Sequence, residues 1–176
     1  PNVYLFNKEW QTVSIPKTSA YHYLISKISP TGDLLFVSNS LNLSGNADIY
    51  LCSVNTFGTV SWQTNCASDL SADDYGVCLE IDTSGNVYVA AARNNGSNTD
   101  IYVAKYSGSG VFQWDYTLTD GGGNDAPADI LIDASGDIFI AGSFYNSSTD
   151  NDVVLIKLDS GGNHLNHDFY DHNNLP

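Results

Sequence analysis

Short apolar runs alternate with turns rich in Gly, Asp, Asn and Ser along nearly the whole chain. Three similar runs each follow a turn that ends in Gly and precede a polar loop: DLLFVSNS (33–40), NVYVAAAR (86–93) and DIFIAGSF (137–144). The apolar segments after these loops each begin with an Asp, 52 residues apart, at Asp48, Asp100 and Asp152. A fixed period of this size is typical of a repeat architecture, in which each unit buries its apolar faces against its neighbours.

Each repeat contains four such runs. In the middle unit they are VCLEID (77–82), NVYVAAA (86–92), DIYVAKY (100–106) and VFQWDYT (111–117). The connections at 82–86 and 133–137 combine an Asp, which can bond the backbone two residues on, with a Gly that supplies positive φ, and so predict hairpin turns. Four strands per unit predict the blade of a β-propeller.

The spacing of apolar residues indicates how the blades pack. The second and third runs of each unit are apolar at almost every position, which requires cover on both faces of the sheet. The fourth run alternates instead, with Phe112 and Trp114 on either side of Gln113, as expected for a half-exposed outer strand. The pattern therefore predicts an all-β fold, a propeller-like array of four-stranded antiparallel blades.

The array does not contain a whole number of blades. NVYLF (2–6) and WQTVSI (10–15) are similar to the third and fourth strands of a unit. We expect a half blade at 1–18, followed by blades at 19–68, 69–119 and 120–176, all in one structural domain. About three and a half blades result, whereas closed propellers have four to eight. Either another copy of the chain or sequence outside these residues would complete the half blade.

Two segments of the middle unit resemble a known family. The residues DTSGNVYVAA (82–91) and DIYVAKYSGSG (100–110) are similar to the SBBP type of β-propeller repeat, which is found in large secreted and cell-surface proteins. The resemblance covers the chain from about residue 20 onward and implies a propeller fold and an extracellular or cell-surface location. It implies no particular chemistry, because the family is defined by residues that build blades.

An incomplete blade leaves an unpaired strand edge, which is a template for pairing with another chain. The residues expected to form this assembly edge are Val3, Tyr4, Leu5, Phe6, Trp10, Val13 and Ile15. A head-to-tail contact between identical copies gives rings or open filaments. The main interpretation is therefore an extracellular structural protein, a filament subunit. The alternative is a piece of a larger secreted propeller that binds or cleaves carbohydrate.

The charge of the chain narrows its partners. Six Lys and Arg residues against 20 Asp and Glu residues give a formal net charge of −14, which disfavours nucleic acid and anionic membranes. No apolar run approaches the roughly 18 residues of a membrane span. Calcium bound by loop carboxylates is the one cofactor considered, and its signal is weak because no D-x-D-x-D-G loop is present.

Three Asn-x-Ser sequons fall in the same loop of successive units, between the second and third strands. Their acceptor residues are Asn42, Asn95 and Asn146. A glycan acceptor must be exposed, and this loop is expected to be. The sequons predict N-linked glycans if the source is a eukaryotic secretory pathway, although this loop is also simply the longest one rich in Asn and Ser.

The cysteines predict one structural bond. Cys66 and Cys78 flank one inter-blade connection and could form a disulfide, whereas Cys52 is expected to be a core residue.

Catalytic and metal-binding candidates are sparse. A C-terminal stretch contains His164, His167 and His172, but this spacing along a strand is poor for a shared metal. Two carboxylates lie on first strands near the expected axis and define no reaction, Glu80 and Asp129. We therefore expect no catalytic residues, no metal site and a non-enzymatic protein.

Overall fold

The computed structural model describes residues 24–41, 44–66, 72–119, 122–146 and 150–171, which form strands and no helix. Sheet A contains β1 (Ile25–Ile28), β2 (Leu34–Leu41), β3 (Ala47–Val54) and β4 (Val60–Cys66). Sheet B contains β5 (Tyr75–Ile81), β6 (Val87–Asn94), β7 (Thr99–Tyr106) and β8 (Phe112–Leu118). Sheet C contains β9 (Ala126–Ile132), β10 (Ile138–Asn146), β11 (Asp150–Leu158) and β12 (His164–Tyr170). Within this part of the chain, nothing could cross a bilayer as a helix.

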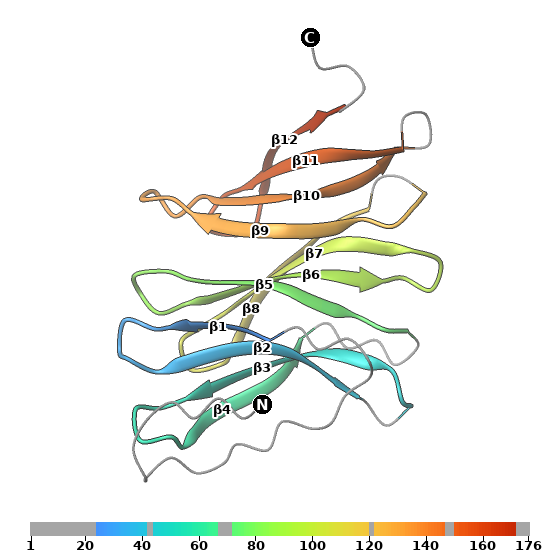
Figure 1. Ribbon diagram of the computed structural model, residues 1–176. Coiled ribbons are helices and arrows are strands. Elements are labelled where there is room, and N and C mark those ends of the chain that lie inside the picture. The colour runs from blue at the N-terminus through green and yellow to red at the C-terminus, as the bar shows by residue number, and fades with distance from the viewer. Residues whose placement is uncertain (1–23, 42–43, 67–71, 120–121, 147–149, 172–176) are drawn as a thin grey trace.

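The three sheets lie one above another in chain order, with sheet B in the middle (Figure 1). In each sheet every strand pairs antiparallel with its neighbours in the sequence. The prediction of an all-β fold made of four-stranded antiparallel units is confirmed, and the predicted strands agree with the observed ones to within about two residues. The half blade predicted for 1–18 lies outside the described residues.

The central strands of sheet B explain why their sequences are continuously apolar. On β6, Val89 and Ala91 face sheet A, whereas Tyr88 and Ala90 face sheet C. All four side chains are at most 1% exposed. Successive residues of a strand point to opposite faces, so a strand covered on both faces needs an apolar residue at every position. Two hydrophobic cores result, one between sheets A and B and one between sheets B and C.

The hairpins within the sheets share one turn geometry. In each, the N–H of the first turn residue bonds the carbonyl of the fifth, and a Gly at the fourth position bonds back to the first, as in 82–86 and 159–163. These six glycines have φ between 79° and 89°. The side chain of the first residue accepts backbone N–H groups inside the turn; Asp82, for example, accepts from Ser84 at 2.9 Å and from Asn86 at 2.8 Å. The Asp and Gly spacing noted in the sequence therefore fixes the hairpins.

Buried aspartates link successive sheets near the loops between the second and third strands. Asp74 and Asp125 are 0% and 1% exposed. Their backbone N–H groups donate to the carbonyls of Ala47 and Thr99 in the preceding sheet, both at 2.7 Å. Their carboxylates accept the N–H of a residue at the end of the second strand of their own sheet, Asn94 for Asp74 and Tyr145 for Asp125, both at 2.8 Å.

Tryptophans link successive sheets near the hairpins between the third and fourth strands. The indole N–H of Trp62 on β4 donates to the carbonyl of Gly108 in sheet B at 3.0 Å, and that of Trp114 on β8 donates to Ser160 in sheet C at 3.3 Å. The rings lie so close to the turn glycines that a Cβ at Gly110 or Gly162 would be 2.6 Å from them. We call each such arrangement a Trp–Gly contact.

The Trp–Gly contact predicts that Gly110→Ala is unusually destabilising. Positive φ alone costs an alanine about 1–2 kcal/mol, and overpacking against Trp62 adds about 1–3 kcal/mol. Gly85→Ala is the matched control, because Gly85 has φ 83° in the same turn type and nothing lies within 4 Å of its would-be Cβ. Chemical denaturation of both variants measures the difference, and equal losses would contradict the contact.

The turn at Asp82 predicts a pH-dependent stability. Burial raises the pKa of Asp82, but hydrogen bonds from Asn86 and Tyr88 outweigh it and hold this pKa below its ordinary value. A depressed pKa contributes stability that is present above the unfolded-state pKa, about 3.9, and is lost as the pH falls through the folded-state pKa. Asp82→Asn keeps the turn, as Asn55 does naturally with acceptor distances of 3.0 Å. The wild type should be more stable than Asp82→Asn by about 1 kcal/mol or less at neutral pH. Denaturation between pH 7 and 2 should show this gap closing in acid.

Candidate functional site

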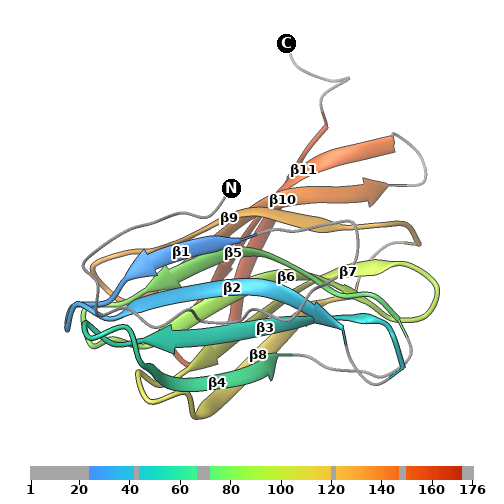
Figure 2. The ribbon, with the colours of Figure 1, turned by 60° about the horizontal axis from the view of Figure 1, so that its bottom comes forward.

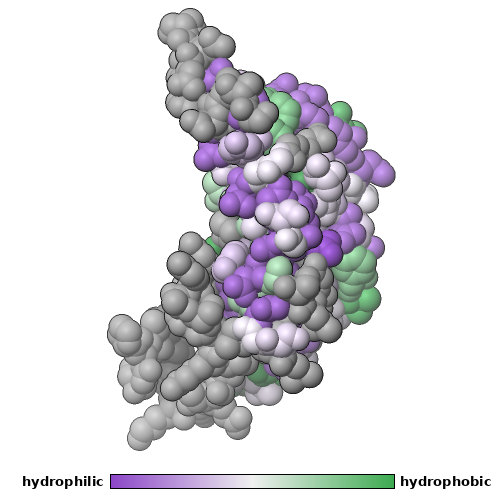
Figure 3. Space-filling view, turned by 90° about the vertical axis from the view of Figure 1, so that its right-hand side faces the viewer, coloured by the Kyte–Doolittle hydropathy of each residue, from purple (hydrophilic) through white to green (hydrophobic). Residues whose placement is uncertain are grey.

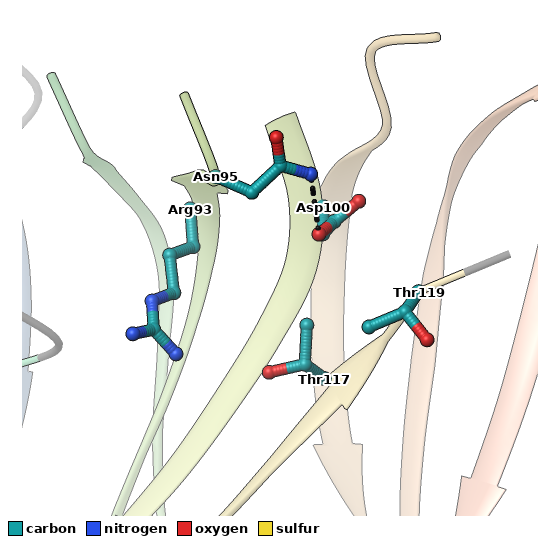
Figure 4. Close-up of a pocket in the computed structure, with 5 residues that line it drawn as sticks. All are labelled: Arg93, Asn95, Asp100, Thr117 and Thr119. Atoms are coloured by element: carbon teal, nitrogen blue, oxygen red, sulfur yellow. Dashed lines mark hydrogen bonds between the residues drawn. The ribbon is translucent and has the colours of Figure 1, made fainter. Parts of the chain in front are cut away.

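A polar pocket of about 300 Å³ opens on sheet B near the β6–β7 loop. Its lining side chains come from the end of β6, that loop, β7 and the end of β8: Arg93, Asn95, Asp100, Thr117 and Thr119. They surround an open space, with Arg93 on one side and Asp100 and Thr119 on the other (Figure 4). The described surface on the side of the stack where this loop lies is mostly hydrophilic (Figure 3).

Arg93 is the only arginine in the sequence. Its guanidinium carbon lies 5.4 Å from the centre of the Tyr102 ring, a cation–π distance. The ion pairs of the described residues join Lys27 to Glu80 and Lys157 to Asp137, and none involves Arg93. In a chain with a net charge of −14, an arginine without a carboxylate partner among the described residues leaves its N–H donors available to a ligand.

Asp100 and Asn95 form the rigid wall of the pocket. Asp100 is 7% exposed, and its carboxylate accepts from the side-chain amide of Asn95 at 3.0 Å. The same amide nitrogen donates to the side chain of Asn98, while the side-chain Oδ1 of Asn95 accepts the backbone N–H groups of Ser97 and Asn98 at 2.9 and 3.1 Å. The loop is thus held by its own side chains, and the pocket wall needs no ligand to form.

The pocket lies at positions where sheets B and C differ. Arg93 and Thr117 occupy positions that correspond to Phe144 and Phe169 in sheet C, by the register of each strand with its partner. Those two phenylalanine rings pack at a centroid distance of 4.5 Å. The corresponding place in sheet B carries a charged and a small polar side chain instead. In sheet A the same positions are also polar, Ser40 and Asn65. Sheets A and B thus leave unfilled by aromatic rings a place that sheet C fills, and such variable positions on a shared scaffold are candidates for function.

A second polar cluster lies where the first strands β1, β5 and β9 come together (Figure 2). Lys27 on β1 forms an ion pair with Glu80 on β5, and the other Glu80 oxygen accepts the N–H of Ile81 at 3.0 Å. Burial raises the pKa of the Cys78 thiol to about 12, with the Asp129 charge adding to the shift and Lys27 opposing it. The cluster joins two sheets electrostatically, and its thiol is protonated at neutral pH.

The other predicted site residues are dispersed. Asn95 lines the pocket with both amide hydrogens engaged, so a glycan there would displace one hydrogen bond. Asn146 donates to Asp152 at 3.0 Å. Asn42 and the whole assembly edge at 3–15 lie outside the described residues, and the sequons remain predictions.

The predicted bridge between Cys66 and Cys78 is not formed in the structure, where both are free thiols. Cys66 packs in the core between sheets A and B, and Cys78 in the core between sheets B and C. The alternation of β5 turns Cys78 away from the sheet that carries Cys66. The two thiols therefore lie on opposite sides of sheet B, although one short connection separates them in the sequence.

The histidines of β12 form a short ring stack. His164 and His167 are hydrogen-bonded through ring nitrogens 3.0 Å apart, and His164 stacks on Tyr116 of sheet B at 5.8 Å. His172 lies outside the described residues. Within the described ranges, no group of three or more His, Cys, Asp or Glu side chains could hold a metal ion.

Sequence reasoning missed Arg93, Asp100 and Thr117 as a group. One signal was present: a lone arginine at a position where the other repeats have Ser40 and Phe144. Its proximity to the end of β8 follows only from strand pairing.

No family model and no curated protein sequence matches the chain. Solved structures do match. A Hadza microbial sialidase is 13% identical with a TM-score of 0.61, over 85% of this chain and 38% of the sialidase. An ulvan lyase of a polysaccharide lyase family, bound to a -[GlcA(1-4)Rha3S]- saccharide, is 12% identical with a TM-score of 0.59, over 89% and 45%. A Dyadobacter fermentans protein is 10% identical with a TM-score of 0.59, over 78% and 37%.

At these identities the similarity is one of fold, and the chain spans less than half the length of each of the three proteins. The interpretation of the chain as a non-enzymatic protein is nevertheless overturned. Two of these proteins are enzymes that share its arrangement of sheets. The missing catalytic motif was weak evidence, because residues distant in the sequence can assemble a site on such a scaffold.

Proposed function

We propose that this chain belongs to a secreted β-propeller protein that acts on carbohydrate, and that it binds a saccharide in the pocket beside Arg93. The observation that carries the proposal is the polar pocket at positions that sheet C fills with two phenylalanines. Saccharides present many hydroxyl groups, which the amide, hydroxyl, carboxylate and guanidinium groups of the pocket can bind from preformed positions.

Binding has more support than cleavage. Asp100 is the only carboxylate among the residues that line the pocket, and it is already hydrogen-bonded to Asn95. Most glycoside hydrolases use two carboxyl groups on either side of the scissile bond. Cleavage at this pocket would therefore need a second carboxyl group from beyond the residues that line it.

The filament interpretation has weaker support. Its assembly edge at 3–15 lies outside the described residues, and two of the similar structures are carbohydrate-active enzymes. The SBBP resemblance fits either interpretation, because it concerns the blades rather than a site.

The saccharide proposal predicts that Arg93→Ala weakens binding about tenfold or more, since a hydrogen bond from a charged group contributes about 1.5–3 kcal/mol. Thr117→Phe should abolish binding while preserving the fold, because sheet C has Phe at the corresponding position. Calorimetric titration with neutral and acidic oligosaccharides measures both effects.

Lys105→Ala is the matched control for the loss of a cation. Lys105 also lies over a tyrosine ring, 5.0 Å from the centre of Tyr88, but it does not line the pocket. Its removal should leave the affinity unchanged. Saccharide binding that survives both Arg93→Ala and Thr117→Phe would place the site elsewhere.

A further inference from the structure

Two histidines on the last strand of sheet C meet through their ring nitrogens. Nδ1 of His167 lies 3.0 Å from Nε2 of His164, and the ring centres are 5.0 Å apart. His164 is exposed and His167 is half-buried, so solvent can reach the pair. Neutral imidazole is the commonest protein ligand of metal ions. The pair is therefore a candidate for metal binding, on a different sheet from the pocket beside Arg93.

A β-bulge brings the two histidines to one face of β12. In a regular strand, residues three apart point to opposite faces. The register pairs His167 with Ile156 on β11. It pairs His164 with Leu158, two positions further along β11, so that Leu165 is an extra residue on β12. Both partners on β11 belong to the core between sheets B and C, and both histidines therefore project from the side of β12 that faces sheet B.

Aromatic neighbours hold the two rings in place. The ring of His164 is parallel to that of Tyr116 on β8, with an interplanar angle of 4° and a centroid distance of 5.8 Å. The ring of His167 packs edge-to-face on Phe169 at a centroid distance of 4.8 Å. Because these contacts already restrict both side chains, less conformational entropy is lost when the pair captures a ligand.

The separation of the two nitrogens matches that of two ligands on one metal ion. Bonds from zinc to imidazole nitrogen are about 2.0–2.1 Å long, so two such nitrogens at an angle of about 90–109° are about 2.9–3.4 Å apart. The observed 3.0 Å falls in this range. One ring N–H donates to the other nitrogen when no metal is bound. Metal binding requires that proton to move to the outer nitrogen of the same ring, which leaves both facing lone pairs free.

The bulge belongs to the scaffold, but the histidines do not. All three sheets have a register shift at the same place between their third and fourth strands. The corresponding positions in the other two sheets carry no pair of nitrogen ligands: Val60 and Gln63 in sheet A, and Phe112 and Asp115 in sheet B. The fold therefore does not require two histidines here.

We propose that His164 and His167 form a binding site for a divalent transition metal ion that prefers imidazole, with Cu²⁺ bound more tightly than Zn²⁺. Two protein ligands leave the remaining coordination positions to water, so the site is open. The net charge of −14 attracts cations in general, whereas the imidazole ligands select transition metals over Mg²⁺ and Ca²⁺. The site does not depend on saccharide binding at the pocket beside Arg93.

Calorimetric titration of the 176-residue protein with Cu²⁺, in an excess of Mg²⁺ that occupies surface carboxylates, tests the site. The variants are His164→Phe and His167→Gln, which introduce the residues found at these positions in sheets B and A. The phenylalanine also preserves a ring beside Tyr116. The wild type should bind one Cu²⁺ per chain at this site. Each single variant should weaken binding about tenfold or more, because the second imidazole binds intramolecularly once the first has bound.

The double variant should bind Cu²⁺ no more weakly than either single variant, since chelation needs both nitrogens. Electron paramagnetic resonance should show two nitrogen ligands on copper in the wild type and at most one in each single variant. His172→Ala, which removes the third histidine of the C-terminal stretch, is the matched control and should leave the affinity unchanged. The proposal is overturned if the wild type shows no saturable binding, if both single variants bind as tightly as the wild type, if their losses add as for independent sites, or if His172→Ala abolishes binding.

Discussion

The need to cover both faces of each sheet governs this molecule. The central strands of sheet B are apolar on both faces, so this sheet must have a neighbour on either side. In the middle of the stack this requirement is met: Tyr88 and Val89 on β6 are adjacent in sequence, belong to different cores and are both almost fully buried. Burial of this kind is not directional. It holds the sheets together but does not determine how one is rotated or shifted against the next.

Polar contacts supply that missing direction. On one side of the stack, Asp74 and Asp125 each bond the preceding sheet through the backbone N–H and their own sheet through the carboxylate. On the other side, Trp62 and Trp114 contact turn glycines of the following sheet. Two polar contacts at opposite edges of an apolar interface restrict both the rotation and the shift of one sheet against the next. The pocket beside Arg93 lies within sheet B, and its lining is positioned by the pairing of β6, β7 and β8.

The sequence predicted the strands and hairpins well because their causes are local. A continuous apolar run between Asp and Gly turns has few other ways to fold, and the Asp82 turn is held by side chains within five residues. The candidate site was beyond such reasoning. Arg93 and Thr117 lie 24 residues apart in the sequence and share a pocket only through the pairing of β6, β7 and β8. The disulfide expectation failed for a related reason, since closeness in sequence did not show which face of β5 carries Cys78.

The strand order within each sheet follows the sequence without a crossover. All pairing inside a sheet therefore joins segments separated by one short hairpin, which keeps the loop-closure entropy small and favours rapid formation of local structure. Stability, by contrast, arises between sheets. Such a chain is expected to grow and shrink in units of one sheet, both during folding and over evolutionary time, because duplication of about 52 residues adds a complete set of local instructions together with a face on which the next unit can assemble.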